Sequence, residues 1–594
     1  MMTFEIWMIF IILILTLVLF ATDWVRYDIV ALLSLLAVVI TGLIPTGRAF
    51  SGFSNSAVIT VAAVLVLSQG LQNSGLVESV GKQLVRVKGG IMVQVGLLTS
   101  LVALLSIFIN NVGAVALLLP VTLYIAREKE IPASALLMPL AFGAHFGGMI
   151  TLIGTPTNLI VSSFREQSIG QPFQMFDFAP VGIGITIASL LFIITIGWRL
   201  IPKRKSQTSV RELFDIQDYV TEVELTKESK LVGERLSEIG KYTENGVNIL
   251  SLVRNKEKRM APAPQTKFNE GDILIVQCGT KELEDLVSNA NLKLVGSKDI
   301  EREDLVTEEM TLVEAVIAAN SPLVNNSAFS VDLRRRHGVN LLAVFRQGSQ
   351  LRTRLDRIRF REGDVLLLQG HPQTTSEALS VLACLPLAER DLRIGKPKQI
   401  ILSVLIFVTA VVLAAMNVFS VAVAFVAGAV AMVLANQVSL REAYESINWP
   451  ILILLGAMIP VGEALETTGG AQLIADFILR YGAQMAPALI LGIIMIVTMF
   501  LSDIVNNAAA VVLMAPIGIS LAQSLGGSVD TLLMGIVIAS SCAFLTPIGH
   551  QSNTLVLGPG GYKFGDYWRM GLLIEIIVVI VGVPLILNFW PFGM

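Results

Sequence analysis

Charged residues are scarce in this chain of 594 residues, because Asp, Glu, Lys and Arg make up 15% of it while hydrophobic residues make up 54%. An ordinary soluble protein has about 25% charged residues, so the composition excludes a soluble chain and indicates a membrane protein. Cysteine is also rare. The three cysteines lie too far apart to suggest a disulfide framework or a zinc site, at Cys278, Cys384 and Cys542.

The four histidines form no metal-binding or nucleophile pattern, at His145, His337, His371 and His550. A membrane enzyme is therefore not favoured, and we expect no cofactor beyond coupling ions. A potassium channel is also disfavoured, because the sequence contains no carbonyl-lined filter of the TVGYG kind. His145 lies among glycines and is expected to be a satisfied core residue.

The charges that are present are concentrated in one block, since residues 203–398 contain 59 of the 89 charged residues. This distribution predicts a soluble insert between two membrane halves, residues 1–202 and 399–594. Lys203, Arg204 and Lys205 lead into the block. By the positive-inside rule the block 203–398 is cytoplasmic and both termini lie outside, which places the protein in the cell (inner) membrane.

Apolar runs long enough to cross a bilayer occur five times in each half. The expected spans are residues 5–22, 27–44, 57–73, 134–152 and 181–200, and then 399–417, 420–438, 449–466, 531–548 and 570–590. Between the third and fourth span of each half lie an amphipathic stretch (76–90; 470–481) and an apolar pair that is broken at two asparagines. Unpaired backbone groups at such a break cannot face lipid, so each pair is predicted to be a re-entrant helical hairpin buried in protein.

Two motifs occur once in each half. "FINNVGAVALLLPV" (108–121) returns as "IVNNAAAVVLMAPI" (504–517), and "TLIGTPTNLIV" (151–161) returns as "TPIGHQSNTLV" (546–556). Five crossings per half is an odd number, so the second half is inverted relative to the first. The predicted fold is a polytopic α-helical membrane protein with an inverted repeat of five spans plus a re-entrant hairpin per half. Inverted repeats with interrupted helices are typical of secondary transporters.

The paired asparagines suit a site for ions. Sodium is bound by several oxygens, which the carbonyls of a broken helix and Asn or Thr side chains supply, while the free N–H groups of half-helices attract an anion. The alternative is structural, because a single Asn inside a membrane is commonly an interhelical hydrogen bond. The recurrence of both motifs favours the site.

With these motifs the sequence resembles the divalent-anion:sodium symporter family of the ion transporter superfamily, over roughly residues 1–200 and 399–594. That family has Ser-Asn-Thr at each hairpin tip, and alignment on Pro120 and Pro516 places Asn110 and Asn506 at the Asn. Both flanking positions differ from the family pattern. Ile109 and Val505 replace the Ser, and Asn111 and Asn507 replace the Thr.

The resemblance implies one sodium ion in each half and a substrate between them. It implies sodium ligands at Asn110, Gly154 and Asn158 in the first half and at Asn506, Gly549 and Asn553 in the second half. It implies substrate contacts at Asn111, Thr155, Asn507 and His550. For His550 a contact with the substrate and simple packing at the helix break remain open.

The motifs contain no Arg that would bind a carboxylate, so backbone dipoles and amides must neutralise the anion, which suits a compact oxyanion. Within the family, a chain with Asn-Asn at both hairpin tips and a cytoplasmic insert most resembles the sulfate transporters of cyanobacteria and algae. Sodium-coupled uptake of sulfate is therefore the first expectation, and sodium-coupled dicarboxylate transport is the second. A sodium/proton antiporter is the third, because Asp503 is an acidic residue next to a motif.

The cytoplasmic block is itself duplicated at a shift of 92 residues, because "GVNILSLVR" (246–254) recurs as "GVNLLAVFR" (338–346). The duplication predicts two α/β domains, 203–300 and 301–398, with short strands and helices such as "LVGERLSEI" (231–239). They resemble the C-terminal ligand-binding domains of potassium-conductance regulators, the TrkA-C (RCK-C) type. The resemblance implies a homodimer and regulation by a cytosolic nucleotide, and a purely structural dimerisation module is the alternative.

A run of arginines in the second copy is either a phosphate-attracting surface or a solvated face: Arg352, Arg354, Arg357, Arg359 and Arg361. The other expected partners are the lipid bilayer, sodium and a small anion. No nucleic acid is expected.

Overall fold

The computed structural model describes residues 3–22, 24–75, 87, 89–202, 220–241, 248–254, 257–260, 265–277, 286–295, 311–318, 321–346, 349–351, 358–387, 397–482, 485–547 and 549–593. The chain forms two compact units, Met1–Arg204 with Arg390–Met594, and Lys205–Glu389. The expected boundaries at 203 and at 300–301 fall outside the described residues, as do Cys278, Arg352, Arg354 and Arg357.

The first half of the membrane unit is helical. Its helices are α1 (Phe4–Thr22), α2 (Tyr27–Ile40), α3 (Ser56–Asn73), α5 (Ile91–Ser106), α6 (Asn111–Glu128), α7 (Ser134–Gly148), α8 (Pro156–Ile169) and α9 (Ala179–Phe192), which continues through a π-helical turn, Ile193–Gly197, into α10 (Trp198–Leu200). The first amphipathic stretch, 76–90, lies almost entirely outside the described residues.

The second half follows the same order of elements. Its helices are α16 (Pro397–Ala415), α17 (Val421–Leu434), α18 (Leu440–Ser446), α19 (Trp449–Thr467), α20 (Gly470–Gly482), α21 (Pro487–Ile504), α22 (Asn507–Leu525), α23 (Val529–Ser540), α24 (Gln551–Leu557) and α25 (Trp568–Phe589). Among the described residues, seven helices are long and apolar enough to cross a membrane, and six further apolar helices are shorter.

Four expected spans are wrong at their C-terminal ends. The spans 27–44 and 420–438 stop as helices at Ile40 and Leu434, and the spans 134–152 and 531–548 stop at Gly148 and Ser540. Beyond Gly148 and Ser540 the carbonyl groups bind side chains in place of helical N–H groups, as the contacts of Asn158 and Asn553 below show. Hydropathy alone cannot detect this exchange, because the segments stay apolar after the helix has ended.

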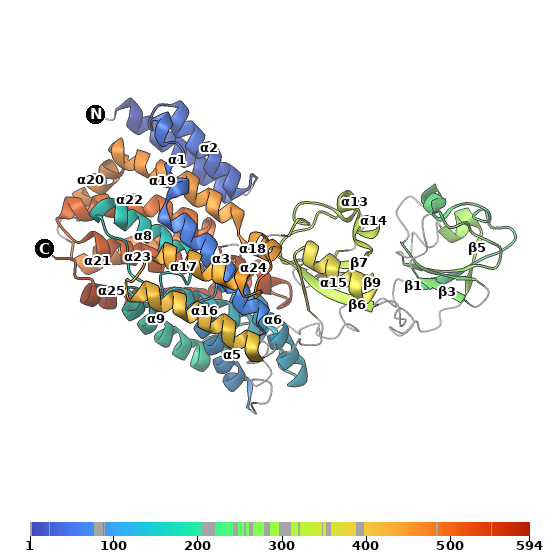
Figure 1. The fold of residues 1–594 in the computed structure, drawn as a ribbon. Helices are drawn as coiled ribbons and strands as arrows, with labels where there is room; N and C mark the ends of the chain where they lie inside the picture. The colour runs from blue at the N-terminus through green and yellow to red at the C-terminus, as the bar shows by residue number, and fades with distance from the viewer. Residues whose placement is uncertain are drawn as a thin grey trace. The chain divides into compact units, whose positions relative to one another are not determined.

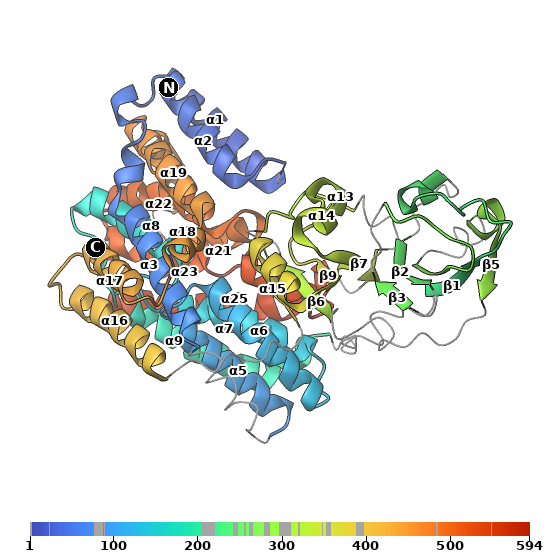
Figure 2. The same cartoon turned by 45° about the vertical axis from the view of Figure 1, so that its right-hand side comes forward.

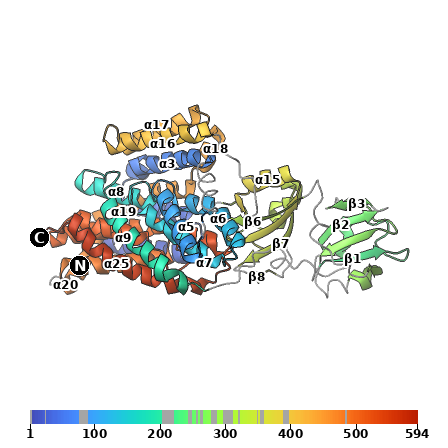
Figure 3. The same ribbon diagram turned by 90° about the horizontal axis from the view of Figure 1, so that it is seen from below.

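The helices of the two halves pack against each other. In Figures 1 and 3, α3 of the first half lies beside α16 and α17 of the second. In Figure 2, α1 and α2 lie beside α19. Helix α9 packs on α25, and α8 packs on α22 and α23. Each half is therefore completed by the other, which brings the two sequence motifs into one core.

The second unit contains two five-stranded antiparallel sheets, with strand orders β3-β2-β4-β1-β5 and β10-β6-β9-β7-β8. The strands are β1 (Val220–Leu225), β2 (Asn248–Arg254), β3 (Glu257–Met260), β4 (Ile273–Gln277), β5 (Leu292–Val295), β6 (Thr311–Ile317), β7 (Asn340–Arg346), β8 (Ser349–Gln350), β9 (Val365–Gly370) and β10 (Cys384–Pro386). The two orders are the same when strands are matched copy by copy. In the second copy α15 (Pro372–Val381) packs on β6, β9 and β10, and the short helices α13 (Ala328–Val331) and α14 (Leu333–His337) lie nearby.

The predicted duplication of the block is visible in its ion pairs. Arg254 binds Asp272 through two hydrogen bonds of 2.8 and 2.7 Å, and Arg346 binds Asp364 with the same distances. The expected helix at 231–239 is wrong, because only a 3-10 helix, Leu236–Lys241, forms there. Burial raises the pKa of the Cys384 thiol to about 12, so this cysteine is not a thiolate at neutral pH.

Candidate functional site

The first asparagine of each pair caps the second arm of its hairpin. The side-chain oxygen of Asn110 accepts a hydrogen bond from the N–H of Val112 at 3.0 Å, and that of Asn506 accepts one from Ala508 at 2.9 Å. Asn is among the best N-cap residues, because its side chain satisfies an N–H that the helix leaves free. The interruption at the asparagines is therefore confirmed, with α6 and α22 each starting one residue later.

The second asparagine of each pair joins the two arms of its hairpin. The side-chain oxygen of Asn111 accepts a hydrogen bond from Ser106 Oγ at 2.7 Å, and that of Asn507 accepts one from Ser502 Oγ at 2.8 Å. Both asparagines are buried, with 3% and 7% of their surface exposed. The sequence analysis missed both serines, although each lies five residues before its asparagine.

The first helix break, residues 149–155, is held by Asn158. Its side-chain nitrogen donates to the carbonyl oxygens of Gly148 at 3.0 Å and Thr151 at 2.7 Å. Thr151 Oγ1 in turn donates to the carbonyl of Ile107 in the hairpin tip at 2.5 Å. The break and the hairpin tip of the first half are thus in direct contact.

The second break, residues 541–550, repeats this arrangement with Asn553. Its side-chain nitrogen donates to the carbonyl oxygens of Ala543 at 2.7 Å and Thr546 at 3.2 Å. Thr546 Oγ1 donates to the backbone carbonyl of Asp503 at 2.9 Å. Each of these contacts corresponds to one in the first half at a shift of 395 or 396 residues.

The glycines predicted as ligands lie where the breaks turn back on themselves. A Cβ atom on Gly154 would come within 2.6 Å of the Gly148 carbonyl oxygen, and one on Gly549 would come within 2.8 Å of the Ala543 Cβ. Both distances are shorter than van der Waals contact, so a side chain at either position would open the break.

The two breaks meet each other through His145 of α7. One ring nitrogen lies 3.3 Å from the Ser541 carbonyl oxygen, and the other lies 3.3 Å from the side-chain oxygen of Asn553. The rings of His145 and His550 are 4.1 Å apart between centroids, and Thr157 Oγ1 is 3.3 Å from Ser541 Oγ. His145 is fully buried, as expected for a core residue, but it also binds a predicted ligand of the opposite half, which the sequence analysis missed.

Thr155 and His550 occupy equivalent positions, at the N-terminal ends of α8 and α24. The Nδ1 atom of His550 accepts a hydrogen bond from the N–H of Ser552 at 3.0 Å, so Nδ1 carries no proton and the neutral ring carries its proton on Nε2. His550 is partly exposed. Thr155 makes no capping bond to α8 and accepts a hydrogen bond from Thr157 Oγ1 at 3.3 Å.

Asp503 lies near a second carboxyl group. Its Oδ1 accepts a hydrogen bond from the N–H of Leu545 in the second break at 3.0 Å, and its carboxyl group is close enough to that of Glu575 of α25 for the two to interact electrostatically. Both residues are more than nine-tenths buried. Two buried carboxyl groups that interact disfavour ionisation of both at once. The sequence analysis singled out Asp503 but missed Glu575, which lies 72 residues later in an apolar helix.

Four helices begin at the tips and breaks, α6, α8, α22 and α24. Their N-terminal N–H groups carry partial positive charge. The tips and breaks, residues 106–111, 145–158, 502–507 and 541–553, contain no Lys or Arg. The arrangement therefore offers dipoles, amides and imidazole N–H groups to an anion and backbone carbonyls to a cation.

Comparison with known proteins identifies the family of the chain. The chain is 32% identical to an uncharacterized transporter of Synechocystis over 95% of this chain and 94% of that protein. It is 29% identical to a putative sulfur deprivation response regulator of Chlamydomonas reinhardtii (93% and 96% covered) and 26% identical to sodium/sulfate cotransporter 1 of the same alga (60% and 42% covered). It matches the citrate transporter family, CitMHS, over residues 17–524 and 466–593. The chain therefore belongs to the CitMHS family of membrane transporters.

Proposed function

We propose that the protein is a secondary active transporter that takes up a divalent anion, sulfate in the first place, together with sodium. The observation that carries the proposal is that four helices begin at tips and breaks without Lys or Arg, while side-chain contacts join each tip to its break and His145 joins the two breaks. Helix dipoles and uncharged donors bind compact oxyanions without a fixed cation. A relative named as a sodium/sulfate cotransporter supports the choice of both ions.

The proposed sodium ligands are Asn110, Gly154 and Asn158 in the first half and Asn506, Gly549 and Asn553 in the second half. The contacts of Asn158 and Asn553 support this assignment, because each amide holds two carbonyl groups of its break in place. Sodium is a hard cation that prefers such oxygens. Asn158 and Asn553 contribute mainly by fixing the carbonyl groups of the two breaks.

The proposed substrate contacts are Asn111, Thr155, Asn507 and His550. His550 supports the assignment best, since its Nδ1 is used by the helix cap and its Nε2–H is left to donate. The oxygens of Asn111 and Asn507 accept bonds from serines, which directs their NH2 groups elsewhere. Such donors suit an anion whose charge is spread over several oxygens.

The proposed architecture is an inverted repeat that works by alternating access, with re-entrant hairpins α5–α6 and α21–α22 and both termini outside. The recurrence of break and tip contacts in the two halves supports the repeat. The two sheets of the block are proposed to be TrkA-C-like domains that dimerise and regulate transport, and their identical strand orders support the duplication. A cytosolic nucleotide is their proposed ligand.

The substrate is tested by uptake of labelled sulfate into liposomes that contain the purified protein, with succinate, citrate and sulfate as competitors. Sulfate is expected to compete best. Stronger competition by succinate or citrate would shift the assignment to the second candidate, a sodium-coupled dicarboxylate transporter.

A sodium/proton antiporter is the other candidate, and the presence of two neighbouring buried carboxyl groups, Asp503 and Glu575, favours it. A pH jump imposed on vesicles without any anion substrate distinguishes the two. Sodium movement driven by the jump alone would support the antiporter, whereas the anion transporter requires sulfate for net sodium uptake.

A further inference from the structure

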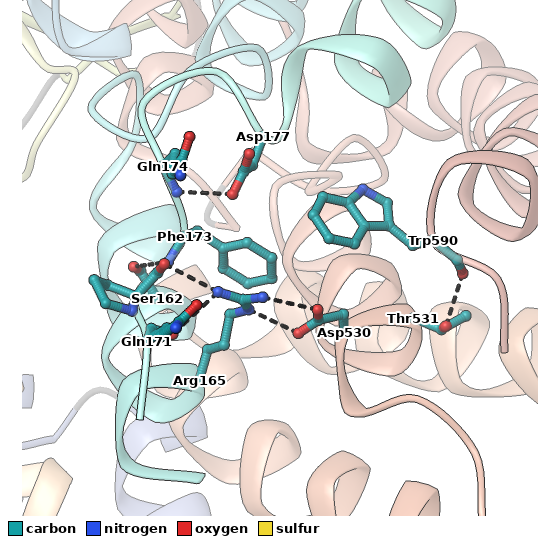
Figure 4. Close-up of polar contacts among 10 residues, drawn as sticks. Ser162, Arg165, Gln171, Phe173, Gln174, Asp177, Asp530, Thr531 and Trp590 are labelled. Atoms are coloured by element: carbon teal, nitrogen blue, oxygen red, sulfur yellow. Dashed lines mark hydrogen bonds and ion pairs between the residues drawn. The ribbon is translucent and has the colours of Figure 1, made fainter. Parts of the chain in front are cut away.

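Arg165, near the C-terminal end of α8, binds Asp530 at the start of α23. Its Nε and Nη2 atoms donate to the two carboxylate oxygens of Asp530 at 2.7 and 2.9 Å. Only 13% and 16% of the two side chains are exposed. A bidentate pair that is this well shielded is among the stronger and more directional interactions of a protein. It joins a helix of the first half to a helix of the second (Figure 4).

The same guanidinium group also organises the loop that follows α8. Its Nη1 atom donates to the carbonyl oxygens of Gln171 and Pro172 at 3.1 and 3.0 Å, and its carbon lies 4.6 Å from the centre of the Phe173 ring. Figure 4 shows this ring beside the guanidinium group, with Trp590 beyond it. The N–H of Phe173 donates to Ser162 Oγ at 2.9 Å. One side chain therefore fixes the loop onto α8 and α23 together.

The loop in turn supports the first helix break. The N–H of Leu152, in the middle of the break, donates to the carbonyl oxygen of Met175 at 3.0 Å. The neighbouring carbonyl of Thr151 is the one that Asn158 holds. A short chain of contacts thus runs from Asp530 through Arg165 and the loop to the carbonyls of the first proposed sodium site.

From this chain of contacts we infer that Arg165 and Asp530 are positioning residues for the first sodium site, an inference that rests on the proposed function. Neither residue touches the ion. Together they hold the loop that shapes the break, and they tie this break to the helix that leads into the second break. The corresponding place in the second half has a neutral contact, in which Tyr562 Oη donates to the Ser134 carbonyl and accepts from the N–H of Met138.

The affinity of transport for sodium distinguishes a positioning role of Arg165 and Asp530 from a purely structural one, because loss of a purely structural contact would leave this affinity unchanged. In Asp530→Asn we expect the sodium concentration for half-maximal sulfate uptake to rise roughly tenfold, as is typical for loss of a residue that supports metal ligands, with the maximal rate changed less than twofold. The charge swap Arg165→Asp with Asp530→Arg restores the affinity at least in part. Glu445→Gln is the matched control, because it removes an exposed ion pair with Arg441 far along the chain from the site.

Hydrogen–deuterium exchange of the full-length protein in detergent tests the positioning without any transport. Asp530→Asn is expected to speed exchange in residues 149–158 and 171–178 and to leave 541–553 as in the unaltered protein. Unchanged exchange in 149–158, or an equal rise across all helices, would overturn the inference. If the unaltered protein shows no sodium-dependent uptake, the proposed function is wrong, while the exchange result still decides whether Arg165 and Asp530 hold the break.

Discussion

In the first membrane half the N–H of Leu152 in the break donates to the backbone oxygen of Met175. The equivalent residue of the second half is Pro547, which has no N–H, and there the N–H of Leu545, two residues earlier, donates to the carboxylate of Asp503. The asparagine that holds each break is the same in both halves. The two halves therefore share the asparagine contacts nearest the proposed ions, and they differ in the groups that bind the N–H groups of the breaks. We expect the two sodium sites to have similar ligands but different affinities.

The largest effect is expected at the shared contacts. Asn110→Ala and Asn506→Ala should each reduce gradient-driven uptake to background, because each removes a proposed ligand and the cap of a half-helix at the site. Measurement is by labelled sulfate uptake in liposomes, with folding checked by size-exclusion chromatography in detergent.

Asn448→Ala is the matched control, since Asn448 caps α19 through its side chain but lies outside the tips and breaks. Loss of a cap costs about 1 kcal/mol of stability in either place, so the control separates capping from ion binding. Full transport in Asn110→Ala or Asn506→Ala would sink the assignment of the ion sites.

A smaller effect is expected at the support of the second break. Asp503→Ala leaves the buried Leu545 N–H without its partner, which should lower the free energy of unfolding by about 1–3 kcal/mol. Asp503→Asn retains an acceptor for Leu545, so its loss should be smaller. Thermal unfolding in detergent measures both.

The comparison between the halves supplies the control for Asp503. Ile107 lies at the equivalent position of the first half, and Ile107→Ala removes no side-chain hydrogen bond. If Asp503→Ala were no more destabilising than Ile107→Ala, Asp503 would not be the support of its break.

His550 tests the difference between the two N-cap positions that are proposed to face the substrate, because His550 caps its helix and Thr155 does not. His550→Asn keeps an acceptor where Nδ1 caps α24 but loses the donor at Nε2. The KM for sulfate should therefore rise about tenfold or more, because one hydrogen bond to a charged group contributes about 1.5–3 kcal/mol. His550→Gln retains an amide donor near Nε2 and should keep a lower KM than the Asn variant. An unchanged KM in both variants would leave His550 with a purely structural role.

The smallest effect on specificity is expected from the soluble block, residues 203–398. Replacement of residues 206–395 by a flexible linker should preserve the preference for sulfate and sodium while it changes the maximal rate, because the proposed site lies wholly in the other unit. A changed order of competing anions, in a variant whose membrane halves still fold, would place part of the site in the block.

The local features of the membrane halves were predictable from the sequence. Asn110, Asn506 and the two breaks each carry a short pattern of their own, and the structure places them where that pattern predicts. The contacts between distant segments were not predictable, because His145 with Asn553 and Arg165 with Asp530 join positions hundreds of residues apart. Such pairs leave no periodicity and no local composition signal in one sequence.

The errors at the ends of α7 and α23 have the same origin. The residues after Gly148 and Ser540 remain apolar, and the helix stops there because side chains from elsewhere take over the backbone carbonyls. In the block, "LVGERLSEI" has helical composition but forms a 3-10 helix at its end only, which shows that tertiary contacts outweigh local propensity.

In the proposed mechanism, sodium moving down its gradient drives sulfate uphill through a site made by both halves. The decisive measurement is accumulation of labelled sulfate in liposomes that have sodium outside and potassium inside. Internal sulfate is expected to rise above the external concentration and to fall back when sodium is made equal on both sides. Sulfate entry that only reaches equilibrium, at the same rate with potassium on both sides, would show that sodium does not drive the uptake.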